Sequence, residues 1–254
     1  MQVGPCRGGP RSRGVNRGQQ SYLELDGIIF DKDGTLFDFG ATWNTWALDL
    51  IAELSDGDAS TARRIAQETD FDLNTRQFRP TSPIIAGTGR EAAECVARAL
   101  PGRSLDALEA LMNERAATAP QVPPTDLAPL LNDLAGRGLK LGVMTNDSEY
   151  AARAHLTAAG VLDTFDWVAG FDSGFGAKPA PTPLLAFAEH TGLEPARIAI
   201  VGDSTHDLIA GQAAGMVPVA VLSGMANATV LSPYAEVVLP HIGHLPNWLS
   251  GQDA

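Results

Sequence analysis

The sequence predicts an α/β fold: a mostly parallel sheet with helices on both faces, interrupted after its first strand by an inserted helical segment. Three observations predict it. A buried strand pattern, Gly27–Phe30, stands near the start of the chain. Strand and helix patterns then alternate from about residue 125 to residue 239. Between the first strand and the next strand pattern, residues 139–144, lie more than 100 residues, whereas a simple crossover between parallel strands needs only a few tens of residues.

The first strand ends in two carboxylates. Its residues are apolar, and Asp31 and Asp33 follow in the sequence Asp-Lys-Asp-Gly-Thr-Leu. A core does not tolerate two unpaired charges, and open α/β sheets bind ligands beyond the carboxyl ends of their strands. We therefore predict that both carboxylates form the floor of an active site. An acidic turn without function is the alternative, whereas a calcium loop would need a third ligand at Thr35 and a helix before it.

Helical patterns dominate the long gap after the first strand. Separated by proline and glycine, they cover residues 41–54, 58–69, 89–100 and 104–117. We expect residues 40–121 to form a helical cap domain, and residues 21–39 and 122–254 to form the α/β core. Trp43 and Trp46 recur at helical spacing and are predicted to pack inside the cap. A cap beside a site at strand ends excludes water and contacts the substrate.

The rest of the chain alternates helix and strand. Thr125 is a candidate N-cap for a helix ending near Ala135. Further helices are expected at 148–159, 182–191 and 205–214. Strands are expected at 139–144, 166–169, 197–201, 217–222 and 236–239.

Composition narrows the possible functions. The 254 residues are 44% hydrophobic with net charge −12, and the first twenty carry four arginines and no acid, which leaves the remainder close to −16. This acidity argues against binding nucleic acid or an anionic membrane. Cys6 and Cys95 indicate no disulfide framework, and no apolar run is long enough to span a membrane. We expect residues 1–20 to be a disordered tail and the protein to be cytoplasmic.

Polar residues follow several predicted strands. Each pattern alone has an ordinary explanation, because Thr-Asn often caps a helix, a lone lysine is usually solvated and Gly-Asp often makes a tight turn. In chain order the positions are Asp31, Asp33, Thr145, Asn146, Lys178, Asp203 and Asp207. Together the patterns Asp-x-Asp-Gly-Thr, strand-Thr-Asn, Lys-Pro and Gly-Asp-x-x-x-Asp resemble the motifs of the haloacid dehalogenase-like hydrolase superfamily.

The resemblance covers nearly all of residues 25–249. On the stretch VGDSTHDLIAGQAAGMVPVAV it is closest to the phosphoglycolate phosphatase-like branch. It implies a Rossmann-like core with an α-helical cap between the first two motifs. It also implies a magnesium-dependent phosphatase of a small phosphorylated metabolite, with phosphoglycolate as the leading candidate. Lys32 departs from the pattern, since many relatives carry a hydrophobic residue there.

The resemblance assigns chemical roles to the four aspartates. The carboxylates of Asp31 and Asp203 and the backbone carbonyl of Asp33 would bind Mg²⁺, with Asp207 orienting bound water or pairing with a lysine. Asp31 would attack phosphorus and form an aspartyl-phosphate. Asp33 would protonate the leaving alkoxide and later take a proton from the attacking water.

Other residues would bind the substrate. By the same resemblance, the Thr145 hydroxyl and the Asn146 backbone amide would hold phosphoryl oxygens, and Lys178 would neutralise negative charge. In a cap loop, Arg79 and Arg90 are candidates for binding a substrate carboxylate. A solvated arginine is an equally good interpretation of each.

Three other functions remain open at this stage. A haloacid dehalogenase would use Asp31 on carbon and would need neither a metal nor Asp33, Asp203 and Asp207. A sugar phosphomutase would keep the same core but retain the phosphoryl group. A non-catalytic phosphate- or metal-binding regulator would need no nucleophile. The protein is expected to be a monomer or a homodimer.

Overall fold

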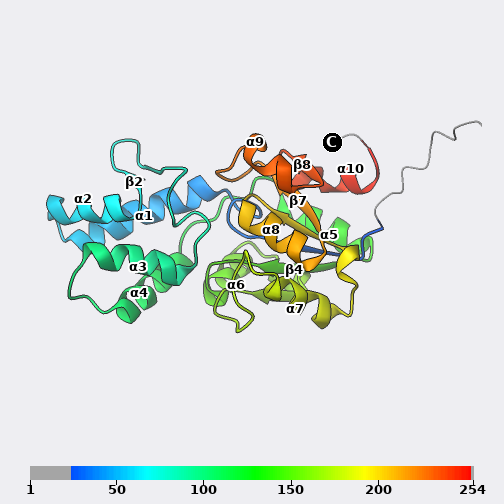
Figure 1. Cartoon of the computed structure of the whole chain (residues 1–254), viewed down its shortest axis with the longest axis horizontal. Coiled ribbons are helices and arrows are strands. Elements are labelled where there is room, and N and C mark those ends of the chain that lie inside the picture. Colours follow the sequence, from blue (N-terminus) through cyan, green and yellow to red (C-terminus); the bar gives the residue numbers. More distant parts are fainter. Residues whose placement is uncertain (1–23, 253–254) are drawn as a thin grey trace, which may run out of the picture.

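The computed structural model describes residues 24–252 (Figure 1). Six strands form one sheet in the order β5-β4-β1-β6-β7-β8, and every neighbouring pair is parallel. Its strands are β1 (Gly27–Phe30), β4 (Lys140–Met144), β5 (Trp167–Ala169), β6 (Ile198–Gly202), β7 (Val217–Val221) and β8 (Val237–Leu239). The predicted α/β class is confirmed. Within the described range, no helix is both long and apolar enough to cross a membrane.

Helices cover both faces of the sheet, which explains why β1 is apolar at every position. Successive side chains of a strand point to opposite faces. Ile28 and Phe30 therefore join one core with the helices α5 (Leu127–Gly136), α6 (Glu149–Ala158) and α10 (Leu245–Leu249). Ile29 joins a second core with α7 (Thr182–Thr191) and α8 (Thr205–Ala214).

The order of the strands reverses at β1. The chain places β4 and β5 on one side of β1 and β6, β7 and β8 on the other. Phe30 pairs with Val143 of β4 and with Val201 of β6, so the three strands end nearly level. The residues that follow them meet at the carboxyl edge of the sheet, at the switch point where such folds bind ligands.

A helical unit, residues Phe39–Ala119, lies to one side of the sheet (Figure 1). It contains α1 (Phe39–Ser55), α2 (Ala59–Glu68), α3 (Gly89–Ala99) and α4 (Leu105–Ala117). Trp43 and Trp46 are buried in a hydrophobic core of this unit, as predicted. A hairpin of β2 (Phe71–Asp72) and β3 (Gln77–Phe78) contradicts the prediction that no strand occurs here. Two-residue strands are too short to show an alternating pattern.

Two connections join the helical unit to the sheet, and they run side by side. The backbone N–H of Asp38 donates to the carbonyl of Val122 over 2.8 Å. The Asp38 side chain also caps α1 by accepting from the N–H of Ala41. Beyond the second connection, Asp126 rather than Thr125 occupies the N-cap position of α5.

The connecting segments contain short helices and 3₁₀ turns. The sequence patterns did not predict α9 (Ala228–Leu231) or α10, because four or five residues are too few to show a helical period. The 3₁₀ turns are η1 (Leu162–Thr164), η2 (Pro195–Arg197), η3 (Ser232–Tyr234) and η4 (Ile242–His244). The predicted tail, residues 1–20 with Cys6, lies outside the described residues.

Candidate active site

The loop after β1 turns sharply and presents Asp31 and Asp33. The N–H of Asp31 donates to the carbonyl of Val201 over 2.9 Å, which continues the pairing of β1 with β6. The carbonyl of Lys32 then accepts from the N–H of Leu36 over 2.9 Å. Gly34 has φ +87°, a left-handed conformation that glycine adopts at little cost. The turn therefore begins directly at the strand end and holds both carboxylates at the switch point.

Lys178 contacts two of the predicted aspartates. Its Nζ lies 2.6 Å from Oδ1 of Asp31 and 2.6 Å from Oδ1 of Asp207, and it donates to the carbonyl of Met144 over 2.7 Å. Burial disfavours the ammonium, but the charges of Asp207 and Asp31 outweigh burial and raise the pKa of Lys178. The lysine is therefore charged and fixed between the ends of β1, β4 and the start of α8.

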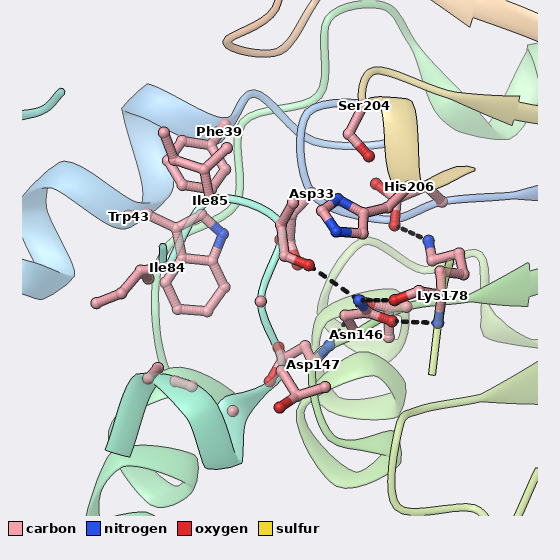
Figure 2. Close-up of a pocket in the computed structure, with 18 of the residues that line it drawn as sticks. Asp33, Phe39, Trp43, Ile84, Ile85, Asn146, Asp147, Lys178, Ser204 and His206 are labelled. Atoms are coloured by element: carbon pink, nitrogen blue, oxygen red, sulfur yellow. Dashed lines mark hydrogen bonds and ion pairs between the residues drawn. The ribbon is translucent and has the colours of Figure 1, made fainter. Parts of the chain in front are cut away.

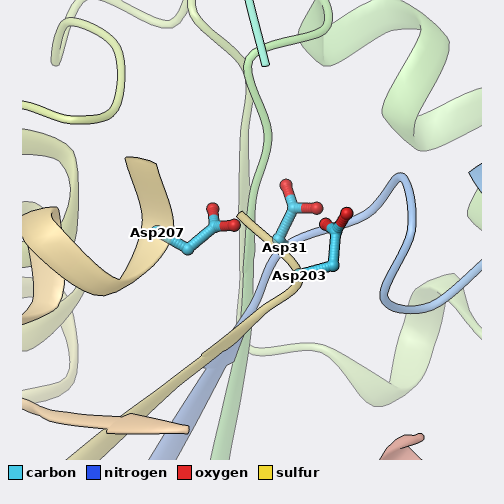
Figure 3. Close-up of side chains that lie close together, drawn as sticks. All are labelled: Asp31, Asp203 and Asp207. Atoms are coloured by element: carbon cyan, nitrogen blue, oxygen red, sulfur yellow. The ribbon is translucent and has the colours of Figure 1, made fainter. Parts of the chain in front are cut away.

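Asp31, Asp203 and Asp207 form a buried acidic cluster at the ends of β1 and β6 (Figure 3). One carboxylate oxygen from each lies within 4.8 Å of the others. Burial is the largest cause that raises the pKa of Asp31 to about 7, against the opposing charge of Lys178. Burial and then the charge of Asp31 raise the pKa of Asp203 as well. Three crowded carboxylates share one ammonium, so the cluster is short of positive charge.

The surroundings of Asp203 fit a divalent cation. Among the described residues no other side chain donates a hydrogen bond to its carboxylate and no cation pairs with it, although only 4% of the residue is exposed. Asp207, in contrast, is already bound by Lys178 and by the N–H and hydroxyl of Ser204. A side chain at Gly224 would overlap the Asp203 carboxylate, so the chain leaves room there. Mg²⁺ binds such carboxylate oxygens together with water and phosphate oxygens.

Thr145 and Asn146 follow β4, next to Lys178. The Thr145 hydroxyl accepts from the N–H of Asp147 over 3.0 Å. The Asn146 amide donates to the carbonyls of Lys178 and Ala86, both over 2.9 Å, and accepts from the N–H of Lys178 over 3.0 Å. The Asn146 side chain therefore ties the Lys178 loop to the helical unit. This contact is not part of the predicted role, which concerned the backbone amide.

A pocket opens between these strand ends and the helical unit (Figure 2). The predicted core residues Asp31, Asp33, Thr145, Asn146, Lys178, Asp203 and Asp207 all contribute to its lining. His206, in the first turn of α8, also lines it. The structure thus brings residues up to 176 positions apart, from Asp31 to Asp207, into one cavity.

Comparisons with known proteins agree with this geometry. A family model for haloacid dehalogenase-like hydrolases matches residues 25–215. The chain belongs to the haloacid dehalogenase-like hydrolase family. A phosphoglycolate phosphatase from Rhodospirillum rubrum is 36% identical over 228 residues, which covers 87% of this chain and 90% of that protein. Another from Xylella fastidiosa is 31% identical over 197 residues, which covers 78% of this chain and 80% of that protein.

A solved structure supports the fold of this hydrolase. CbbY from Rhodobacter sphaeroides in complex with phosphate has a TM-score of 0.65 at 20% identity, covering 87% of this chain and 96% of that chain. At this identity the likeness concerns the fold alone. The resemblance inferred from the motifs is confirmed by the family match.

One cluster in this hydrolase was missed by sequence reasoning. Lys32 is fully buried, and its Nζ lies 2.8 Å from Oδ1 of Asp33, 3.2 Å from Oδ2 of Asp147 and 3.0 Å from Nδ1 of His155. It also lies 5.4 Å from the ring centroid of Trp43. Lys32 was noted only as a departure from the family pattern. The sequence did offer one signal for this cluster, because Lys32 lies two residues after a buried strand. A lysine buried at such a position needs carboxylate partners.

The structure does not bring Arg79 or Arg90 to the pocket of this hydrolase. Arg79 pairs with Asp70 and Asp72 beside the β2–β3 hairpin, at 3.4 and 2.9 Å. Arg90 pairs with Asp106 and Glu109 of α4, and its contact to Asp106 is 2.7 Å. Neither arginine lines the pocket. Acidic residues of the same helical unit bind both guanidinium groups, so a role in substrate binding stays a prediction for each arginine.

Proposed function

We propose that this protein hydrolyses phosphate monoesters of small metabolites, with Asp31 as nucleophile and Mg²⁺ as cofactor. The observation that carries the proposal is the position of Asp31. Its carboxylate ends the central strand, touches the Lys178 ammonium at 2.6 Å and belongs to the acidic cluster with Asp203. A carboxylate nucleophile for a phosphate dianion needs positive charge around it. The names of the relatives from R. rubrum and X. fastidiosa support the same chemistry.

The carboxylates of Asp31 and Asp203 and the carbonyl of Asp33 would hold the metal ion. When bound, Mg²⁺ would offset the charge of the phosphoryl group and of the carboxylates. Asp207 would act indirectly, since it fixes Lys178 at 2.6 Å and bonds the start of α8 through Ser204. Lys178 would neutralise charge on the phosphoryl oxygens that face β1.

Two displacements would complete the reaction. In the first, an Asp31 oxygen forms a bond to phosphorus, the ester P–O bond breaks, and Asp33 gives its proton to the leaving alkoxide. In the second, water attacks phosphorus, Asp33 takes a proton from that water, and the bond from phosphorus to Asp31 breaks. The Thr145 hydroxyl and the backbone N–H of Asn146 would orient the phosphoryl oxygens throughout.

The helical unit would act as the predicted cap, residues 40–121. It supplies one side of the pocket, while the strand ends supply the other. A cap in this position keeps bulk water from the phosphorylated intermediate and contacts the leaving group. Phosphoglycolate is the substrate that the relatives' names put forward, so it belongs in the first assay.

The test is phosphate release by the purified protein from a panel of phosphorylated metabolites that includes phosphoglycolate and sugar phosphates. Each compound is assayed with MgCl₂ and again with excess chelator. We expect release only with the metal, on one compound or a few related ones. Equal release in chelator would contradict the metal assignment. No release from any compound, with the protein folded and Mg²⁺ present, would contradict the proposed hydrolysis.

A further inference from the structure

The wall that the helical unit contributes to the pocket is apolar. It consists mainly of Phe39, Trp43, Trp46, Ile84, Ile85 and Met112. Figure 2 shows several of these side chains on the side of the pocket opposite Lys178. The polar residues among them, Thr88 and Asn113, are neutral. Between residues 24 and 252, the helical unit gives the pocket lining neither a lysine nor an arginine.

The opposite wall is strongly acidic. Carboxylates of Asp31, Asp33, Asp147, Asp203 and Asp207 line it. Its one lining lysine, Lys178, is already paired with two of these carboxylates. A phosphoryl group and a divalent cation would together occupy this end. A second anionic group on the substrate would face the apolar wall, where a charge loses its hydration without gaining a partner.

Two indole N–H groups of the apolar wall find no acceptor among residues 24–252. Trp43 and Trp46 are each 8% exposed, and within this range the Nε1 atoms of both are buried without a hydrogen bond. In Figure 2 the nitrogen edge of Trp43 is turned toward Asp33. A buried donor without an acceptor is unfavourable. An oxygen atom of a bound molecule would satisfy this donor without bringing a charge into the apolar wall.

We infer that the leaving group of the substrate is uncharged and largely apolar, with a neutral oxygen that accepts from the Trp43 indole. An aryl-substituted alcohol esterified to phosphate has this chemistry, whereas glycolate, with its carboxylate, does not. The inference rests on the proposed function, since it assumes that the Asp31 end of the pocket binds the phosphoryl group.

Binding of non-hydrolysable phosphonates separates this inference from catalysis. Calorimetry on the whole protein with MgCl₂ compares benzylphosphonate with phosphonoacetate, which carries a carboxylate in place of the ring. We expect benzylphosphonate to bind about tenfold more tightly or better, because ring burial contributes at least this much. Equal or tighter binding of phosphonoacetate, or binding of neither compound, would overturn the inference.

Hydrolysis is then measured on benzyl phosphate and phosphoglycolate. Preferential binding of benzylphosphonate without cleavage of any ester would sink the proposed function and leave the pocket preference standing. Cleavage of both esters with phosphoglycolate favoured in kcat/KM would keep the proposed function and overturn the inference. Failure of the proposed hydrolysis and failure of the inferred leaving-group preference therefore give different results.

A charge placed in the apolar wall tests the same idea in reverse. Met112→Arg puts a guanidinium among the wall residues of α4, and we expect it to shift the ratio of the two phosphonate affinities at least about tenfold toward phosphonoacetate. Ala110→Arg is the matched control, because Ala110 is exposed on the same helix. An identical ratio in both variants would contradict the inference. If Met112→Arg does not fold, the affinities of the wild type for benzylphosphonate and phosphonoacetate still test the inference.

The neutral oxygen is tested with an isosteric pair. 2-Phenoxyethylphosphonate and 3-phenylpropylphosphonate differ by an ether oxygen in place of a methylene group. We expect the ether to bind severalfold more tightly in the wild type and this advantage to disappear in Trp43→Phe, which keeps an aromatic ring but removes the donor. An advantage that survives in the variant would exclude the Trp43 indole as the donor.

Discussion

The Nζ of Lys32 lies 3.0 Å from Nδ1 of His155, and the other ring nitrogen of His155 lies 2.7 Å from the carbonyl of Ala116. Both contacts are satisfied when Lys32 donates to Nδ1 and the neutral imidazole donates from Nε2. Burial, followed by the charge of Lys32, lowers the pKa of His155 to about 4, which favours this form. The histidine therefore links the helical unit, through Ala116, to the lysine that holds Asp33.

Replacing Lys32 is expected to destabilise the protein strongly. Burial opposes its charge, but Asp33 and Asp147 outweigh burial and raise the pKa of Lys32. Lys32→Met would leave these carboxylates without a cation, which costs about 3–5 kcal/mol. Urea unfolding followed by tryptophan fluorescence measures the loss. Lys140→Met is the control, since Lys140 forms an exposed pair with Asp166 and should lose less than about 1 kcal/mol. Similar losses in both variants would contradict the prediction.

Asp31→Asn should abolish phosphate release while the protein remains folded. The amide keeps the size of the side chain but is a much weaker nucleophile, so kcat should fall by roughly 10³-fold or more. Asp49→Asn, an exposed position on α1, should retain normal activity. Circular dichroism confirms folding of both variants. Wild-type turnover in Asp31→Asn would refute the assignment of the nucleophile.

The acidic cluster predicts how stability depends on pH without metal. The pKa of Asp31 is about 7 in the folded protein against an ordinary value of 3.8, mainly because of burial. Between these values the folded state holds a proton that the unfolded chain has released. The contribution of Asp31 to the free energy of unfolding is therefore full below about pH 4 and is lost as pH rises through 7.

Melting temperatures in chelator test this dependence. The difference in melting temperature between the wild type and Asp31→Asn reports Asp31 together with Asp203 and Lys178, whose pKa values its charge raises. We expect this difference to become less favourable to the wild type as the pH rises from 4 to 7. MgCl₂ should stabilise the wild type more at pH 8 than at pH 5, because only the ionised carboxylate binds the ion well. A difference that does not change with pH would mean that Asp31 titrates normally.

Gly224→Ala should weaken metal binding without unfolding the protein. A methyl group at this position would overlap the carboxylate of Asp203 and displace it. We expect the affinity for Mg²⁺, measured by calorimetry, to fall about tenfold or more. Gly136→Ala is the matched control, because a methyl group there meets no atom within 4 Å. Unchanged affinity in Gly224→Ala would show that Asp203 does not ligate the ion.

Arg79→Ala and Arg90→Ala should leave substrate preference unchanged. Both guanidinium groups are bound by carboxylates outside the pocket, and their side chains are 57% and 40% exposed. We expect kcat/KM values across the substrate panel to stay within about twofold of the wild type, since exposed ion pairs contribute little. A selective loss on a carboxylated substrate in either variant would show that the helical unit rearranges on binding.

The sheet and the grouping of the motif residues at its edge could be predicted because both depend on local patterns. Gly27–Phe30 is apolar on both faces, and the polar residues that follow β1, β4 and β6 occupy the ends of adjacent strands. Parallel pairing then brings Asp31, Thr145 and Asp203 together without further information. The location of these motif residues in one pocket follows directly.

The contacts within the helical unit could not be predicted in this way. Arg90 lies on α3, and its partners Asp106 and Glu109 lie on α4, so their meeting depends on how two helices pack. Lys32 similarly depends on His155, which is 123 positions away. A single sequence shows that such charges need partners, but the direction of a helix face decides which partners they find.

The connections at Asp38 and Val122 also determine which changes in the helical segment the core can tolerate. The segment leaves and rejoins the core at one hydrogen-bonded crossing of 2.8 Å, so its length and contents are independent of the spacing between β1 and β4. Insertions or deletions within that segment need not move Asp31, because β1 pairs directly with β4 and β6. The wall that this segment gives to the pocket can therefore vary while the parallel pairing at the switch point stays the same.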